Sequence, residues 1–144
     1  MRVVVQRCKN ASVTVNQKVV GHISDGLCLL VGFTNEDNEK TIEKMVGKIV
    51  KLRIFPDENG VMNKSVIDSN GSILSVSQFT LYADTSKGNR PSYMKALNGD
   101  EASKLYEYFN NELRKYIKVE TGIFGADMQV SLINMGPTTI LLEM

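Results

Sequence analysis

Two amphipathic helical segments set among many strand-like runs constrain the fold of this chain most. Apolar residues recur at helical spacing in residues 36–51 and again from about residue 100 to residue 116. The strand-like runs lie at residues 2–8, 11–15, 18–23, 26–33, 71–81, 118–121, 127–134 and 138–143. This pattern predicts an α+β protein with a largely antiparallel sheet and two main helices packed on it.

Turn signals separate these segments. Asn16-Gln17 predicts a two-residue hairpin turn, and Asp25-Gly26 is expected to separate the next two strands. Residues 84–99 are rich in Gly, Asn, Ser and Lys and are predicted to form a loop.

Polar residues before each helical segment are the expected helix caps. Thr34 or Asn35 precedes the first segment, and Asp100 opens the second.

Composition narrows the class of protein. The 144 residues suffice for one domain with a real core, which we expect to span residues 1–144. No run approaches the roughly 20 apolar residues of a membrane span, and the first residues enter a strand pattern rather than a signal peptide, so a cytoplasmic location is expected. A net charge of only +1 argues against strong non-specific nucleic-acid binding but permits a local basic patch.

The residues that bind metals or act as bases are few. Cys8 and Cys28 lie in strand-like runs without metal-ligand spacing, and His22 is the single histidine. We therefore expect no metal or other cofactor and two reduced, structural thiols. The chain also lacks a G-x-S-x-G motif, so a Ser-His-Asp arrangement is not expected.

Two short segments carry most of the functional information. They are Ser77-Gln78-Phe79-Thr80-Leu81 and Asn134-Met135-Gly136-Pro137-Thr138-Thr139, and each follows a hydrophobic strand-like run. Polar residues at strand ends are where sites are often built. A cis bond between the Gly and Pro of the second segment would direct carbonyl oxygens to one side, where an ammonium group can bind. The alternative is an ordinary turn between the last two strands.

A hydrolase without a protein base must act by positioning and by backbone dipoles. The turn at Gln78-Phe79-Thr80 is the candidate source of N–H donors for a tetrahedral oxyanion. As a nucleophile Thr80 needs an adjacent base, and none is evident. We favour an orienting role for the Thr80 hydroxyl over covalent attack or a purely structural role.

These segments resemble the D-aminoacyl-tRNA deacylase family, also called the D-tyrosyl-tRNA deacylase family, over the whole chain. The SQFTL and N-x-G-P-x-T motifs carry the resemblance. The start of the chain from Met1 to Arg7, residues 87–92 and residues 125–128 are also similar to that family. The chain departs from the family pattern at Met135, where an acidic residue is usual, and at Thr138, where Val is usual.

The resemblance implies an enzyme that hydrolyses the ester bond of D-aminoacyl-tRNA and of mischarged glycyl-tRNA. It implies a metal-free homodimer in which Gly136-Pro137 of one subunit reaches the Ser77–Thr80 site of the other. Ser77, Gln78, Phe79 and Thr80 would then be catalytic. Gly136, Pro137 and Arg7 would bind substrate, with Arg7 bracing the Gly-Pro loop.

The same resemblance gives a reason for chiral selection. With the ammonium and the ester carbonyl both held, an L-side chain would collide with the Gly-Pro backbone and a D-side chain would point away. The ribose 2′-hydroxyl of the substrate is expected to assist the attacking water.

Basic residues follow the first motif. Lys87, Arg90 and Lys95 lie in the loop after SQFTL and are candidate contacts to tRNA phosphates, or else solvated surface charges. Two other functions remain open: an RNA-end-binding module without chemistry, and a hydrolase of small D-amino-acid esters or amides.

Overall fold

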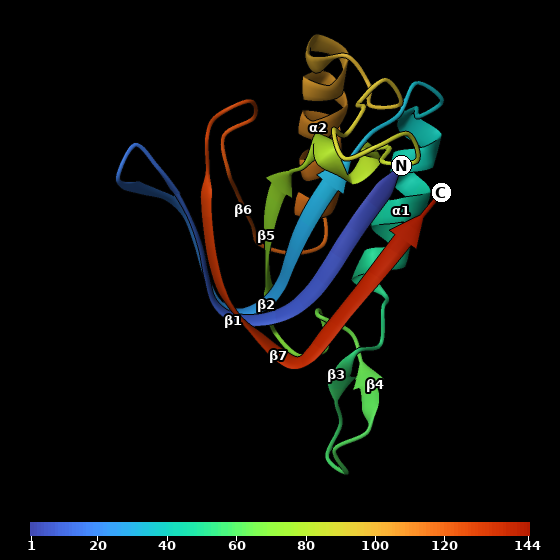
Figure 1. Ribbon diagram of the computed structural model, residues 1–144. Helices are drawn as coiled ribbons and strands as arrows, with labels where there is room; N and C mark the ends of the chain where they lie inside the picture. Colours follow the sequence, from blue (N-terminus) through green and yellow to red (C-terminus); the bar gives the residue numbers. More distant parts are fainter.

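A five-stranded sheet forms the centre of the computed structural model, which describes residues 1–144 (Figure 1). In spatial order the strands are β6 (Val119–Thr121), β5 (Ser72–Ser77), β2 (Lys18–Gly32), β1 (Arg2–Val15) and β7 (Gln129–Glu143). Strand β1 pairs antiparallel with β2 and β7, whereas β5 pairs parallel with β2 and β6. The predicted α+β class with a mostly antiparallel sheet is confirmed, and the two parallel pairings were not predicted.

The first two strands are longer than predicted. Residues 2–15 form one strand, and residues 18–32 form a second that returns through the turn at Asn16-Gln17. The prediction that Asp25-Gly26 separates two strands is wrong, because Gly26 pairs with Cys8 inside β2. Gly26 has φ +147, and a Cβ there would lie 1.8 Å from the carbonyl oxygen of Ser72. This glycine therefore permits the close approach of β5 rather than a turn.

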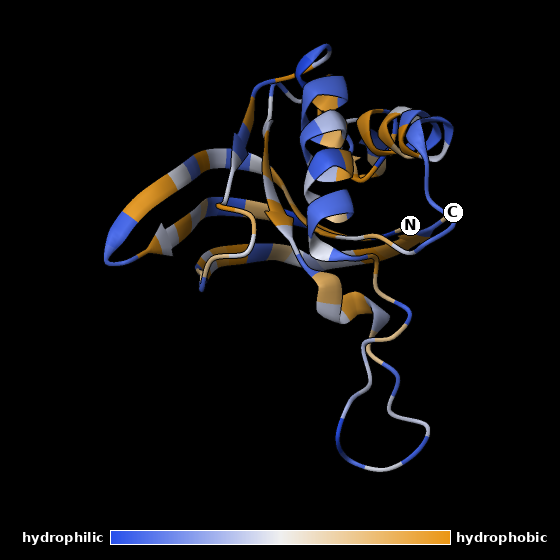
Figure 2. Ribbon diagram, turned by 90° about the horizontal axis from the view of Figure 1, so that it is seen from above, coloured by the Kyte–Doolittle hydropathy of each residue, from blue (hydrophilic) through white to orange (hydrophobic).

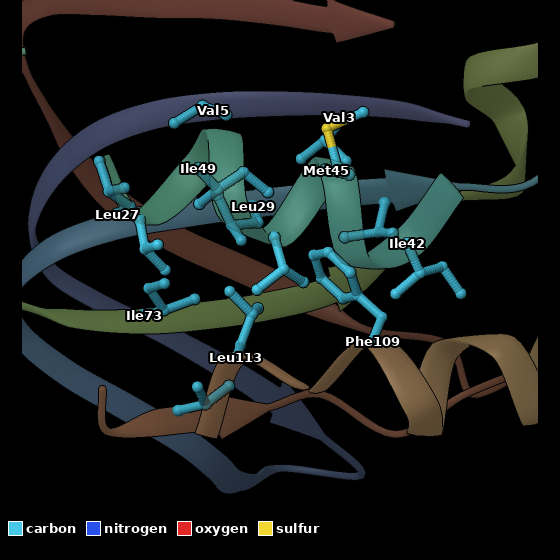
Figure 3. Packing of buried hydrophobic residues seen from close by; sticks show 14 of the residues in the cluster. Val3, Val5, Leu27, Leu29, Ile42, Met45, Ile49, Ile73, Phe109 and Leu113 are labelled. Atoms are coloured by element: carbon cyan, nitrogen blue, oxygen red, sulfur yellow. The ribbon is translucent and has the colours of Figure 1, made fainter. Parts of the chain in front are cut away.

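Two helices pack on one face of the sheet. They are α1 (Glu39–Val50) and α2 (Gly99–Arg114), and Figure 2 shows both on the same side. Their apolar faces meet alternate residues of β1, β2 and β5 in the main core, where Ile42 and Met45 of α1 and Phe109 of α2 are fully buried (Figure 3). The cap predictions are wrong by a few residues. Asn38 caps α1 by accepting from the N–H of Thr41, and Asn98 caps α2 by accepting from the N–H of Asp100.

The opposite face of the sheet buries a smaller cluster of seven residues, which includes Cys8, Cys28 and Val76. Both cysteines are free and buried, as expected. Burial raises the pKa of the Cys8 thiol to about 11 and that of Cys28 to about 12, so both are protonated and unreactive near neutral pH.

A small hairpin of β3 (Phe55–Pro56) and β4 (Met62–Lys64) projects from the body next to the bend of β7 (Figure 1). The 3-10 helix η1 (Phe79–Tyr82) lies at the other end of the sheet, where β5 ends. No helix of the chain is long and apolar enough to cross a membrane.

Candidate active site

The SQFTL segment lies where β5 ends. The strand stops at Ser77 instead of continuing to residue 81 as predicted, because the chain turns at Gln78 into η1. The N–H of Gln78 donates to the carbonyl of Val31 at 2.7 Å, which ties the turn to β2. Within η1 the first intrahelical donor is the N–H of Leu81, which bonds to the Gln78 carbonyl. The N–H groups of Phe79 and Thr80 thus have no acceptor within the helix.

Arg2 holds η1 against the sheet. Its Nη1 donates to the carbonyl of Leu81 at 2.8 Å, and its guanidinium lies over the ring of Tyr82 at 4.7 Å from the centroid. Burial raises the pKa of Tyr82 to about 12, so this ring stays neutral beneath the cation. Sequence reasoning assigned no role to Arg2, although the cation–π pair fixes the turn that bears the free N–H groups.

A pocket of about 570 Å³ opens beside this turn. Ser77, Gln78 and Phe79 line it, whereas Thr80 does not. Most of its wall is apolar and comes from segments that the sequence gave no role, among them Leu97, Phe124 and Met128. The family-like run at residues 125–128 was the available signal for this wall.

The pocket presents few titratable groups. Tyr93 and Asp127 are the only titratable residues in its lining, and the ring of Tyr93 packs edge-on against Phe79 at 5.0 Å. His22 lies exposed on β2 and does not line the pocket. The Thr80 hydroxyl accepts a hydrogen bond from the side-chain amide of Gln78. The arrangement offers backbone donors and oriented polar groups rather than a nucleophile paired with a base.

Gly136 and Pro137 lie in the middle of β7, not at a strand end or in a turn between two strands as predicted. Opposite β1, Thr139 pairs with Gln6 and Asn134 with Cys8, so the intervening residues of β7 form a bulge facing Arg7. We call residues 135–138 the Gly-Pro bulge. The Gly-Pro bond is cis, and both residues are exposed.

Two side-chain contacts hold this bulge. The Nε of Arg7 donates to the Met135 carbonyl at 3.3 Å, and its Nη1 donates to the Ile54 carbonyl at 2.6 Å. Across the base of the bulge, Nδ2 of Asn134 donates to the Thr139 hydroxyl at 2.7 Å. Sequence reasoning anticipated the Arg7 contact but missed the bond between the two residues that flank the motif.

The Gly-Pro bulge is far from the pocket of its own chain. Gln78 bonds to Val31 of β2, and Val31 pairs with Val3 of β1, so the pocket lies at the position of Val3 along β1. The bulge instead lies opposite Arg7 of β1. Four residues along β1 and three strand spacings across the sheet separate the two places by about 20 Å. Figure 1 shows the same separation, with the bend of β7 and the end of β5 at opposite ends of the sheet.

The three predicted RNA contacts are not equivalent. Lys87 and Arg90 are exposed and make no ion pair. Lys95 lies 3.0 Å from Asp84. The pKa of Asp84 is well below its usual range, first because of hydrogen bonds with Ser86 and then because of Lys95. Two of the three cations are thus free, and the third is tied to the loop.

The fold and site define a small α+β protein with a largely apolar pocket beside a turn whose N–H groups at Phe79 and Thr80 have no acceptor within the helix. The comparisons with known proteins specify the class. The model of the D-Tyr-tRNA(Tyr) deacylase family matches residues 4–143. The chain therefore belongs to the D-aminoacyl-tRNA deacylase family, as the sequence motifs predict.

Individual relatives agree with this assignment. The chain is 56% identical to a D-aminoacyl-tRNA deacylase of Bacillus cytotoxicus and 58% identical to one of Brevibacillus brevis, each over 99% of both chains. A solved structure of a c-Myc DNA unwinding element binding protein is 44% identical and superposes with a TM-score of 0.95 over 100% of this chain and 99% of the other. A probable eukaryotic D-amino acid tRNA deacylase, 20% identical with a TM-score of 0.84 over 98% and 97%, shares the fold.

Proposed function

We propose that this protein hydrolyses the ester bond of D-aminoacyl-tRNA, and of mischarged glycyl-tRNA, in the cytoplasm. The full-length similarity to curated D-aminoacyl-tRNA deacylases is the observation that carries this conclusion. Such an activity is chiral proofreading: it recycles tRNA and keeps D-amino acids out of translation.

The pocket supports a mechanism based on positioning. Water attacks the ester carbonyl, the tetrahedral oxyanion forms near the N–H group of Phe79 in the pocket lining, and the 3′-oxygen of the terminal ribose leaves with a proton. An oxyanion donor of this kind contributes about 2.7–4 kcal/mol in enzymes where it has been removed. The Thr80 hydroxyl, held by Gln78, orients this turn. The ribose 2′-hydroxyl helps to activate the water, since the pocket lining holds no histidine and a single carboxylate, that of Asp127.

The Gly-Pro bulge acts on the pocket of a second subunit. It lies about 20 Å from its own pocket, so it cannot contact a substrate bound there. Strand β7 is also a free edge strand that leaves Ile133 and Leu141 each 55% exposed. An apolar edge of this kind is a ready surface for pairing with another copy. A C2 homodimer would bring each bulge to the partner's pocket.

Backbone geometry explains the chiral choice. In the dimer the carbonyls of Gly136 and Pro137 accept hydrogen bonds from the substrate ammonium while the oxyanion donors hold the ester. These two restraints point an L-side chain into the bulge and a D-side chain away from it. Glycine has no side chain to exclude and is therefore also a substrate. Lys87 and Arg90, with Lys95 beside them, contact the RNA end near the pocket.

The decisive experiment compares matched D- and L-tyrosyl-tRNA as substrates of the purified protein. We expect D-tyrosine to be released at least about a hundredfold faster, a discrimination of about 2.7 kcal/mol. Equal rates would refute the exclusion mechanism. A small D-tyrosine ester serves as the control: equally fast turnover of this ester would indicate a small-ester hydrolase, and binding of tRNA without any hydrolysis would indicate an RNA-end-binding module.

A further inference from the structure

The outer face of α1 carries a stripe of lysines. Lys40, Lys44 and Lys48 in the helix and Lys51 at its C-cap are all exposed. At 3.6 residues per turn these four lie within roughly 100° of one another around the helix axis and span about 17 Å along it. None of them makes an ion pair. We call these four residues the lysine stripe.

Acidic residues of the same helix face elsewhere. Glu43 accepts a hydrogen bond from the Tyr108 hydroxyl of α2 at 2.9 Å. This bond, together with the nearby charges of Glu112 and Glu39, raises the pKa of Tyr108 to about 12. Glu43 is thus engaged by α2, while the four lysines of the stripe are exposed. Lys–Lys neighbours four residues apart destabilise a helix by about 0.2–0.5 kcal/mol per pair, so helix stability does not explain the stripe.

Gly47 lies inside the stripe and has no structural reason to be glycine. A Cβ at this position would meet nothing within 4 Å. Glycine in a helix interior costs about 0.5–1 kcal/mol relative to alanine. The missing side chain leaves a shallow hollow lined by Lys44, Lys48, Lys51 and Arg53. Leu52 and the C-terminal residue Met144 complete its lining. Such a hollow lets a ligand approach the helix backbone beside the cations.

The charge of the stripe contrasts with that of the rest of the chain. From Lys44 to Arg53 there are four basic residues and no acidic one, while the whole chain carries a net charge of only +1. The remaining residues together are thus net negative, so this stretch is a local concentration of positive charge that attracts a polyanion.

The segment that precedes α1 lies at the rim of the candidate active site. Phe33 lines the pocket, and the next residue, Thr34, donates its hydroxyl to the Lys95 carbonyl at 2.7 Å. Helix α1 starts at Glu39 and leads away from this rim. An RNA whose end enters the pocket can therefore continue along the helix.

We propose that the lysine stripe binds phosphates of the tRNA substrate beyond its aminoacylated end, with the backbone of the RNA seated over Gly47. This inference rests on the proposed function, since it concerns the same substrate. Lysine–phosphate contacts of this kind position a nucleic acid without reading its sequence.

The test removes two charges from the stripe. Lys44→Gln with Lys48→Gln keeps good helix formers in α1. The control, Lys18→Gln with Lys104→Gln, removes the same charge from two exposed lysines of β2 and α2 that make no ion pair. For the stripe variant we expect kcat/KM on D-tyrosyl-tRNA to fall about tenfold at low salt, and the slope of log kcat/KM against log salt to become shallower by roughly 1.5–2. The control variant and the minimal substrate D-tyrosyl-adenosine should show neither change.

A second variant tests the hollow. Gly47→Gln should raise Tm, because glutamine favours the helix, and yet weaken binding of uncharged tRNA. Two results would overturn the proposal. The first is unchanged tRNA binding in both variants together with an unchanged slope of log kcat/KM against log salt. The second is a fall in kcat/KM on D-tyrosyl-adenosine as large as the fall on D-tyrosyl-tRNA. Binding of the wild type to anionic phospholipid vesicles that the stripe variant loses, with tRNA binding intact, would overturn it as well. If the wild-type protein does not hydrolyse D-tyrosyl-tRNA, the proposed function is refuted. The binding of uncharged tRNA to the wild type and to the stripe variant would still test whether the lysine stripe binds RNA.

Discussion

Complementation between two inactive variants tests whether the active site is shared. Phe79→Pro removes the N–H of residue 79, and proline is well tolerated at the first position of a helix. Loss of one oxyanion donor should lower kcat by about 10²–10³. Gly136→Phe damages the other half of the site, because a Cβ at Gly136 would lie 2.7 Å from the Thr138 hydroxyl and 3.0 Å from Nη2 of Arg7. Each homodimer should be almost inactive.

Mixing the two variants should restore activity. In a mixed dimer one site carries both lesions and the other carries neither. Half of the dimers are mixed after random exchange, so up to about a quarter of wild-type activity should return. The assay is release of D-tyrosine from tRNA, after exchange has been verified with differently tagged subunits.

Phe79→Ala is the matched control for the first variant, since it removes the ring but keeps the N–H. It should retain far more activity than Phe79→Pro. No recovery in a mixture with proven exchange would refute the shared site, and we would then assign the Gly-Pro bulge to its own subunit or to no catalytic role.

Three further predictions concern chemistry and stability. Activity should survive EDTA treatment followed by desalting, and a loss that zinc reverses would show a metal-dependent mechanism. Thr80→Ala should retain measurable turnover, because the hydroxyl orients the turn; an aminoacyl ester trapped on Thr80 would instead establish covalent catalysis. Gly26→Ala should lower the free energy of unfolding by more than about 3 kcal/mol in urea titration, since its Cβ would lie 1.8 Å from the Ser72 carbonyl oxygen, and a wild-type stability would contradict that close approach.

Hydropathy patterns predicted the helices and most strands, because those patterns reflect burial. They failed where backbone geometry decides the outcome. Nothing local distinguishes Gly26 as a site of close approach from a glycine that ends a strand. Likewise the local sequence at Gly136-Pro137 is typical of a turn. Pairing with β1 both before and after these two residues shows that they lie within one bulged strand. The cap of α1 was misplaced because Thr34, Asn35 and Asn38 are all competent caps, and tertiary packing selects one.

The candidate site was predictable to the extent that it lies within the two motifs. Local sequence identified the segments at Gln78 and Gly136 as special, although it did not show that the second is a bulge, and the family resemblance supplied the contact of Arg7. The pocket wall at Phe124 and the brace from Arg2 come from distant parts of the chain, and only the fold brings them to the site. Residue spacing carries no information about such long-range neighbours.

In the proposed homodimer, the separation of the pocket and the Gly-Pro bulge on one chain has a genetic consequence. A subunit that carries both Phe79→Pro and Gly136→Phe would spoil both sites of any dimer it forms with a normal subunit, because it supplies a defective half to each. With equal expression of the two alleles, only the quarter of dimers made of two normal subunits would be active. A subunit with one lesion would leave half of the total activity. The doubly defective allele would therefore be dominant-negative, although each protomer folds around its own complete core.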